Sequence, residues 1–301
     1  MQETLRIIAG RHRSLLGDHP EIEKIHVGFT NTLYRINDCF ILKICADRKN
    51  EERFKKEIQF YHAFKNSGCI PRLYYADTGR DAVPYCYEIL EKIPGVTVYD
   101  VWHTFDERQR EEIIKQLCRA MKLFHRHTGA GYDWGKKTSG LFSVFCRQAE
   151  SLDLFREDEM KLLNKARSGF DALLRSDEFA LVHNDLHFDN VLWHQGKIWL
   201  IDFERSLYAP KDFELDILYR MARKPWKFAS EENEKYTKKS DYANIMTYIE
   251  KYYPELIHTD HLYKRLAIYD MVYFLRQYAD HPEDEALKED VLSAARLVIG
   301  E

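Results

Sequence analysis

Two aspartates and an asparagine stand in polar segments that separate short apolar runs. Asp185 and Asn190 lie five residues apart, and Asp202 directly follows the apolar run 198–201. If these runs are strands, the loops that join them are held at both ends, so the side chains can converge. Carboxylate and amide oxygens are ligands that Mg²⁺ accepts beside phosphate oxygens and water. The pattern therefore predicts a magnesium site at Asn190 and Asp202, and it leaves Asp185 to accept a proton from a hydroxyl group.

The same residues suit phosphoryl transfer, in which a protein mainly positions groups and neutralises charge. The spacing from Asp185 to Asn190 matches the D-x-x-x-x-N pattern of kinase catalytic loops, and Asp202-Phe203-Glu204 stands where D-F-G would stand. We therefore predict that Asp185 is the catalytic base. Asp and Asn also cap turns, and either half of the pattern alone would be explained in that way.

His183 and His187, four residues apart, leave a second interpretation open, a metallohydrolase that binds zinc or iron through His183, Asp185 and His187. Zinc-binding helices of this spacing carry H-E-x-x-H, and the glutamate is absent here. The flanking apolar runs also favour strands over a helix. Structural, hydrogen-bonded histidines are the favoured interpretation.

The first ninety residues supply groups that could hold a nucleotide. Lys43 lies within the apolar stretch 40–44, where an ammonium is costly unless it reaches a partner. Glu57, fourteen residues later on a predicted amphipathic helix, could pin Lys43 toward the phosphates. Upstream, Gly28, Thr30 and Asn31 belong to a loop whose amides and hydroxyls can cover phosphates.

Hydrophobic periodicity gives the elements that must position these residues. Strands are predicted at 21–28, 33–36, 39–45, 69–75, 84–92, 179–182, 191–193 and 198–201. Helices are predicted at 50–65, 106–127, 158–174, 241–253, 262–279 and 283–299. Asn37-Asp38 predicts a tight hairpin. Ile93-Pro94-Gly95 breaks the pattern and separates residues 1–92, a strand-rich lobe, from residues 93–301, a mostly helical lobe.

Composition excludes several classes of protein. The 301 residues carry a net charge of −4, which does not fit a strongly basic nucleic-acid binder. No apolar run reaches the roughly 18 residues of a membrane span, and the first residues do not resemble a signal peptide. The cysteines form no C-x-x-C pair and are expected to be reduced core thiols. We expect a cytoplasmic protein with neither nucleic acid nor membrane as partner.

Taken together, the motifs resemble those of the aminoglycoside phosphotransferase family, small-molecule kinases with the protein-kinase-like fold. The resemblance rests on Gly28-x-x-Asn31-x-x-Tyr34, Lys43, Glu57, His183-Asn184-Asp185-x-His187-x-x-Asn190 and Asp202-Phe203-Glu204. It implies a bilobal α+β fold, with a small β-rich N-terminal lobe and a larger, mostly helical C-terminal lobe. It implies Mg²⁺ and a co-substrate, ATP or GTP, bound between the lobes and contacted by the Glu91 carbonyl and the Ile93 amide. It further implies that Asp216 braces the catalytic loop.

The acceptor is expected to be small. Only thirteen residues separate Asp202 from Asp216, and the chain has no A-P-E motif, which leaves little room for a peptide-binding activation loop. The resemblance implies an aminoglycoside or another amino-alcohol or sugar, and it leaves open whether antibiotic resistance is the native role. A cationic acceptor calls for carboxylates, for which Glu204, Asp212 and Glu214 are candidates. The alternative is a non-catalytic, nucleotide-binding scaffold or coat protein, while the oligomeric state and the nucleotide preference stay open.

Overall fold

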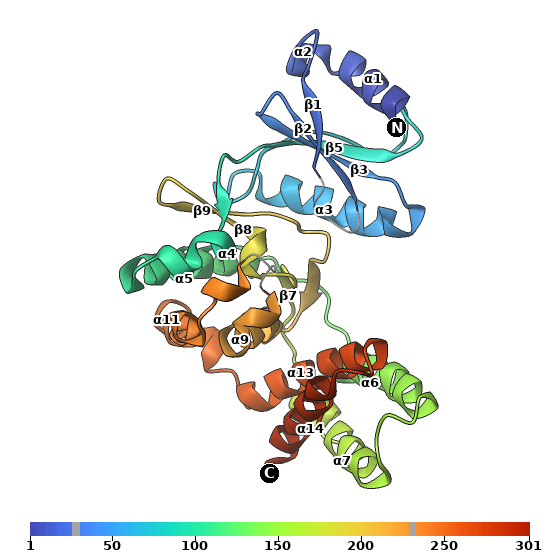
Figure 1. Ribbon diagram of the computed structural model, residues 1–301, viewed down its shortest axis with the longest axis vertical. Coiled ribbons are helices and arrows are strands. Elements are labelled where there is room, and N and C mark those ends of the chain that lie inside the picture. Colours follow the sequence, from blue (N-terminus) through green and yellow to red (C-terminus); the bar gives the residue numbers. More distant parts are fainter. Residues whose placement is uncertain (26–30, 229–232) are drawn as a thin grey trace. The chain divides into compact units, whose positions relative to one another are not determined.

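The computed structural model describes residues 1–25, 31–228 and 233–301 (Figure 1). Contacts within it divide the chain into two compact units. The first unit combines Met1–Asp106 with Asp185–Ser206, and the second combines Glu107–Asn184 with Leu207–Glu301. The segment that carries Asp185, Asn190 and Asp202 thus belongs to the same unit as the N-terminal strands. The lobe boundary after residue 92 stays a prediction.

A five-stranded antiparallel sheet, in the order β1-β2-β3-β5-β4, forms the centre of the first unit. Its strands are β1 (Ile22–Ile25), β2 (Thr32–Ile36), β3 (Phe40–Cys45), β4 (Leu73–Asp77) and β5 (Cys86–Glu91). All five were predicted, although β4 begins four residues later than expected. Pro71, which has no amide hydrogen to give to a ladder, precedes this start. The part of the first predicted strand after Ile25 lies outside the described residues.

The turn between β2 and β3 is the predicted tight hairpin. Asn37 and Asp38 have positive φ angles of 50° and 56°, which match the right-handed twist of the two strands. The Asn37 side chain accepts a hydrogen bond from the Glu21 amide at 2.8 Å and donates one to the Leu16 carbonyl at 2.6 Å. The register of β3, and with it the side of the sheet on which Lys43 lies, is therefore fixed locally.

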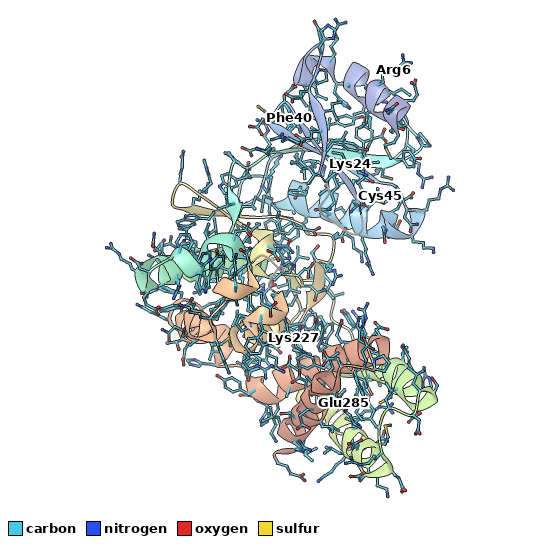
Figure 2. All side chains as sticks on the ribbon, viewed as in Figure 1. Arg6, Lys24, Phe40, Cys45, Lys227 and Glu285 are labelled. Carbon is cyan, nitrogen blue, oxygen red and sulfur yellow. The ribbon has the colours of Figure 1, made fainter. Side chains whose placement is uncertain are left out.

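The two faces of this sheet pack against different helices. Ile8 of α1 (Gln2–Arg11) and Leu16 of α2 (Arg13–Leu16) share one core cluster with Leu42, Ile44, Tyr87 and Ile89. On the other face, Cys45 at the end of β3 (Figure 2) packs with residues of α3 (Glu51–Phe64). Because side chains alternate along a strand, Lys43 and its cross-strand partner Glu88 lie on the α3 face.

A second, three-stranded sheet in the order β6-β8-β9 carries the predicted metal ligands at its end. It consists of β6 (Val96–Thr97), β8 (Val191–His194) and β9 (Lys197–Leu200), and the last two strands were predicted. Val191 pairs with Leu200, and the Ile201 amide donates to the Asn190 carbonyl at 3.1 Å. Antiparallel pairing therefore brings the residue before β8 next to the residues that follow β9.

The second unit is mostly helical, with one short ladder between β7 (Ala180–Val182) and β10 (Leu207–Ala209). Its helices are α5 (Glu107–Phe124), α6 (Trp134–Ser151), α7 (Glu157–Arg167), α8 (Phe170–Leu173), α9 (Leu215–Arg223), α10 (Lys239–Tyr242), α11 (Ile245–Tyr252), α12 (Pro254–Ile257), α13 (Leu262–Asp280) and α14 (Glu285–Ile299). A four-residue helix, α4 (Val98–Val101), belongs to the first unit. The α+β class is thus confirmed.

Several expectations for the second unit were wrong: the helix predicted at 241–253 is α10 and α11, and α9 was not predicted. The helix predicted at 158–174 is two helices, α7 and α8, with Ser168 and Gly169 between them, since glycine is a poor helix former. Helix α6 was missed, although it has a sequence signal. Asp133 caps it by accepting from the Lys136 amide, and its buried side chains Thr138, Phe142, Cys146 and Ala149 recur at helical spacing.

Most of the cysteines are in the core, as expected. Cys45, Cys86, Cys118 and Cys146 are buried, whereas Cys39 is exposed beside the β2–β3 turn and does not fit the expectation of a core thiol. Within the three described ranges, no helix combines the length and the apolar character needed to cross a membrane.

Two glycines of α6 give a matched test of how this helix packs against its neighbours. An added Cβ at Gly135 would lie 2.8 Å from the Asp171 Cα, whereas at Gly140 nothing lies within 4 Å. We expect Gly135→Ala to lower the free energy of unfolding by about 1–3 kcal/mol through overpacking. Gly140→Ala should raise it by about 0.5–1 kcal/mol, because alanine is the better helix former. Urea unfolding of both variants checks this, and shifts of the same sign would contradict the packing of α6.

Candidate active site

A buried ion pair joins the sheet to α3. The Lys43 Nζ atom donates to the Glu57 Oε2 atom at 2.6 Å, and the exposed fractions of the two side chains are only 9% and 1%. Burial works against the charge on Lys43, but the Glu57 and Asp202 carboxylates outweigh it and raise the pKa of Lys43 above its usual range. Lys43 is therefore an ammonium. The structure contains the pair that the sequence predicted.

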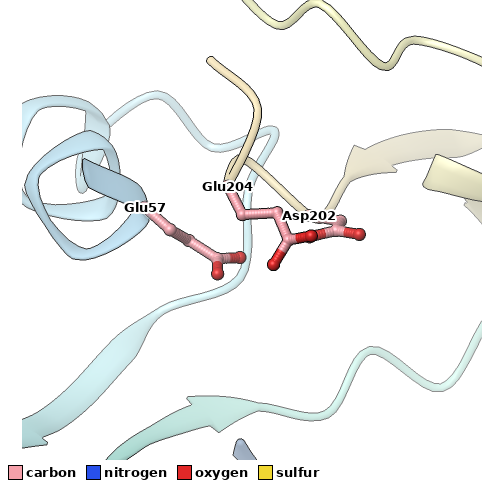
Figure 3. Close-up of side chains that lie close together, drawn as sticks. All are labelled: Glu57, Asp202 and Glu204. Carbon is pink, nitrogen blue, oxygen red and sulfur yellow. The ribbon is translucent and has the colours of Figure 1, made fainter. Parts of the chain in front are cut away.

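Three carboxylates lie close to this ammonium, and Figure 3 shows the three together. Glu57 comes from α3, while Asp202 and Glu204 come from the segment that follows β9, and one oxygen of each lies within 4.8 Å of the others. The Lys43 Nζ atom lies 3.2 Å from an Asp202 oxygen and 4.0 Å from a Glu204 oxygen. Burial raises the pKa of Glu57 to about 7, although Lys43 acts in the opposite direction.

Glu204, one of the predicted acceptor-binding carboxylates, belongs to the cluster around Lys43. Its carboxylate is buried beside Lys43 and accepts a hydrogen bond from the Asn31 side chain at 2.9 Å. Asn31 is one of the three predicted phosphate-covering residues; Gly28 and Thr30 lie outside the described residues. Together with Asp202, Glu204 offers the hard oxygen ligands that suit Mg²⁺.

Glu88 was missed by the sequence reasoning. It stands opposite Lys43 in the β3–β5 ladder, it is fully buried, and neither carboxylate oxygen has a hydrogen-bond partner among the described residues. Burial, and then the nearby Glu57 carboxylate, raise the pKa of Glu88 well above its usual range. A signal was available, because a lone acid in an apolar strand is as costly as a lone lysine there.

Asp185, the predicted base, lies in a loop that Asn190 stabilises through hydrogen bonds. Asn190 donates from its side-chain amide to the Asp185 carbonyl at 2.8 Å, and the Asn190 amide hydrogen-bonds to the His187 carbonyl at 3.0 Å. The Arg205 Nε atom lies 3.6 Å from an Asp185 carboxylate oxygen. The first unit therefore holds Asp185, Asn190 and Asp202 together with Lys43.

The described residues do not support the zinc or iron site. Their one cluster with the geometry of metal ligands is formed by Glu57, Asp202 and Glu204, and it contains no histidine. The His187 Nδ1 atom lies 3.3 Å from an Asp189 oxygen. Burial lowers the pKa of His187, but Asp189 and then Asp185 outweigh burial and raise it overall. His187 therefore acts as a partner of loop carboxylates.

Glu214 holds the backbone just before Asp185, a role that the resemblance implied for Asp216. The Glu214 carboxylate accepts from the amides of His183 and Asn184, at 2.9 and 3.3 Å, and these two residues directly precede Asp185. Asp216 instead pairs with Arg220 one helical turn later. Both acids lie near the start of α9, and their spacing alone could not distinguish them.

Asp212 and Glu214 do not fit the predicted role as acceptor-binding carboxylates, because both are buried and bound to protein partners. The Arg265 guanidinium donates two hydrogen bonds to Asp212, at 2.8 and 2.7 Å, and the Tyr269 hydroxyl donates a third at 3.0 Å. Glu214 is also 3.3 Å from the His125 Nε2 atom. Buried acids with such partners contribute to the structure of the second unit rather than to ligand binding.

The predicted hinge lies at the end of β5. The Glu91 amide donates to the Arg72 carbonyl at 2.8 Å, and the Glu91 side chain accepts from the Arg72 amide at 3.1 Å. The two nucleotide contacts expected there, from the Glu91 carbonyl and the Ile93 amide, stay predictions.

Comparison with solved structures identifies the fold. The chain is similar to aminoglycoside phosphotransferase APH(2'')-Ib bound to ADP, with 16% identity, 97% of this chain and 96% of that chain covered, and a TM-score of 0.67. It is similar to aminoglycoside phosphotransferase APH(4)-Ia, with 14% identity, 98% of each chain covered and a TM-score of 0.62. The architecture is therefore the bilobal, protein-kinase-like α+β fold of these phosphotransferases.

Sequence comparison then gives the family. The model of the phosphotransferase enzyme family matches residues 21–244, so the chain belongs to that family. A stretch of 47 residues, or 16% of this chain, is 47% identical to part of the serine/threonine-protein kinase RIO3 of Bos taurus. The match spans only 9% of the length of that kinase.

The role of Glu214 can be tested through its charge. Burial acts to raise the pKa of Glu214, but the hydrogen bond and charge of His125 outweigh it and hold the pKa below its ordinary value of 4.5. The carboxylate therefore stabilises the folded state above about pH 4.5, and this contribution is lost as the pH falls further. We expect Glu214→Gln to lower the free energy of unfolding by about 2 kcal/mol at pH 7.

The difference between wild type and Glu214→Gln should shrink when urea unfolding is repeated below pH 4. The exposed Glu150 on the same unit provides the control, since Glu150→Gln should change stability little at either pH. A Glu214→Gln variant as stable as wild type at pH 7 would show that the loop is anchored elsewhere.

Proposed function

We propose that this protein is a small-molecule kinase that transfers the γ-phosphoryl group of ATP or GTP to a hydroxyl group. The observation that carries the proposal is the presence, in one compact unit, of the buried Lys43–Glu57 pair and the residues Asp185, Asn190 and Asp202. These groups are the parts that phosphoryl transfer requires: a phosphate-binding cation, a proton acceptor and oxygen ligands for a metal.

Each residue has a distinct task in this mechanism. Asp185 orients the acceptor hydroxyl and takes its proton as the phosphoryl group moves. Asn190 and Asp202 would hold Mg²⁺, with Glu204 as a neighbouring carboxylate, and the ion would neutralise phosphate charge. Lys43, oriented by Glu57, binds phosphate oxygens so that donor and acceptor are aligned.

The nucleotide contacts follow from the hinge and the loop before β2. Glu91 and Ile93 would contact the base through their backbone, and the segment with Gly28, Thr30 and Asn31 would cover the phosphates. Similar structures were determined with ADP and with GDP, so both nucleotides are candidates. Since the reaction uses a nucleoside triphosphate, we expect it to take place in the cytoplasm.

The acceptor proposed is a small, hydroxylated and cationic molecule of the aminoglycoside or amino-alcohol type. Similar structures are complexes with gentamicin, with streptomycin and ATP, and with kanamycin and GDP. Only thirteen residues lie between Asp202 and Asp216, which favours a small acceptor over a peptide. A panel of aminoglycosides and amino-alcohols, screened with ATP and with GTP in the presence of Mg²⁺, identifies the acceptor. The aminoglycosides of this panel also test a role in antibiotic resistance.

The base assignment has a direct test. We expect Asp185→Ala to lower kcat by about 10²- to 10⁴-fold, because the acceptor hydroxyl loses its proton acceptor. The Kd for ADP should change less than about twofold, since Asp185 does not hold the nucleotide. Asp189→Ala is the control, because Asp189 lies in the same loop with an exposed carboxylate.

Turnover and nucleotide titration of the purified variants measure both effects. Unchanged turnover of Asp185→Ala would refute the base assignment. A wild-type protein that binds nucleotide but phosphorylates no acceptor of the panel would instead be a nucleotide-binding scaffold.

A further inference from the structure

Lys43 lies among several acidic side chains. Its ammonium lies 2.6 Å from Glu57, 3.2 Å from Asp202 and 4.0 Å from Glu204, and Glu88 faces it across the β3–β5 ladder. Four carboxyl groups thus surround one ammonium. Asp202 is partly accessible, with 36% of its side chain exposed, while the other three acids are buried. A further cation that entered the cluster would therefore approach from the side of Asp202.

The Lys43 ammonium lies close to the position that a further cation would occupy. Oxygens of Glu57, Asp202 and Glu204 lie within 4.8 Å of one another. A Mg²⁺ ion sits about 2.1 Å from its oxygen ligands. An ion that bound both Asp202 and Glu204 would lie between their oxygens, and both oxygens are already within 4.0 Å of the Lys43 Nζ atom. Two positive charges at such a distance repel one another strongly in a partly buried site.

When a metal binds Asp202, the Lys43 ammonium can remain beside Glu57 and Glu88. Both are buried, one on α3 and one on β5. Glu88 is fully buried, and neither of its oxygens has a hydrogen-bond partner in the part of the chain that the structure describes. A buried carboxyl group without a partner is costly, so a nearby ammonium is its natural compensation.

We propose that Lys43 is the resident counter-ion of this acidic cluster and that it keeps divalent metal out of the nucleotide-free protein. The inference rests on the proposed function, in which Asp202 is a metal ligand and Lys43 binds phosphate. A nucleotide offers the ammonium new anionic partners, and the Asp202 and Glu204 carboxylates are then released to the metal. Metal therefore enters with the nucleotide rather than before it.

The test is Mn²⁺ binding by the full-length protein without nucleotide, measured by the electron paramagnetic resonance signal of free Mn²⁺. We expect Lys43→Met to bind Mn²⁺ at least about tenfold more tightly than wild type, because the competing ammonium is gone. Lys43→Arg keeps the positive charge and should bind as weakly as wild type. Lys55→Met is the matched control, since Lys55 pairs with exposed Glu52 on α3 and its loss changes the net charge equally.

A second substitution shows where the gained metal binds. Adding Asp202→Asn to Lys43→Met should abolish the gain in Mn²⁺ affinity. Affinity of Lys43→Met equal to or below that of wild type would overturn the proposal, as would a gain that survives Asp202→Asn or that Lys55→Met reproduces. Should Lys43→Met fail to fold by circular dichroism, Lys43→Gln, which leaves a polar group among the acids, carries the same expectations.

This experiment is separable from the test of the proposed function. Phosphoryl transfer is measured on the wild-type protein with nucleotide and acceptor, whereas the Mn²⁺ comparison uses neither. A wild-type protein without transferase activity would refute the kinase assignment and leave the competition between Lys43 and metal intact. Active wild type with no gain for Lys43→Met would refute the competition alone.

Discussion

The first unit depends on one buried ion pair, that between Lys43 and Glu57. Two charges removed from water are tolerated only when they remain paired, and separating them leaves an uncompensated charge in the interior. The pair therefore fixes where α3 lies on the sheet, a position that Cys45, Phe54, Ile58 and Cys86 support by apolar contact. Phe203 adds to the same constraint, because its amide donates to the second Glu57 oxygen at 3.3 Å. The segment that carries Asp202 is thereby tied to α3.

The remaining reactive groups lie at the ends of rigid elements. The antiparallel β8–β9 hairpin brings Asn190 beside Ile201, so the two predicted metal ligands emerge from the same end of the sheet. On the other side of Asp185, Glu214 holds the two preceding backbone amides. A site built in this way needs little loop rigidity of its own, because hydrogen bonds to secondary structure hold the backbone on both sides.

The fold was predictable where local pattern and tertiary environment agree. Most strands of the two sheets in the first unit were predicted as short apolar runs, and Asn37-Asp38 fixes a hairpin through local backbone preference. Prediction failed where local start and stop signals were overlooked. Ser168-Gly169 ends α7 within a continuous apolar period, and α6 was overlooked although Asp133 marks its start. The family model and the similar solved structures agree with the resemblance that the motifs gave.

The sequence by itself determined the chemistry: the types, order and spacing of Lys43, Glu57, Asp185, Asn190 and Asp202 are those of a phosphotransferase, because each residue type has few other uses in such a pattern. Only the tertiary structure decided which carboxylates are free to act. Asp212 and Glu214 are acidic in the sequence but are bound to Arg265 and to backbone amides in the fold. Glu88 looks like one acid in an apolar strand until the β3–β5 register sets it opposite Lys43. A carboxylate's role depends on its partners and its burial, and both are set by residues far away in the chain.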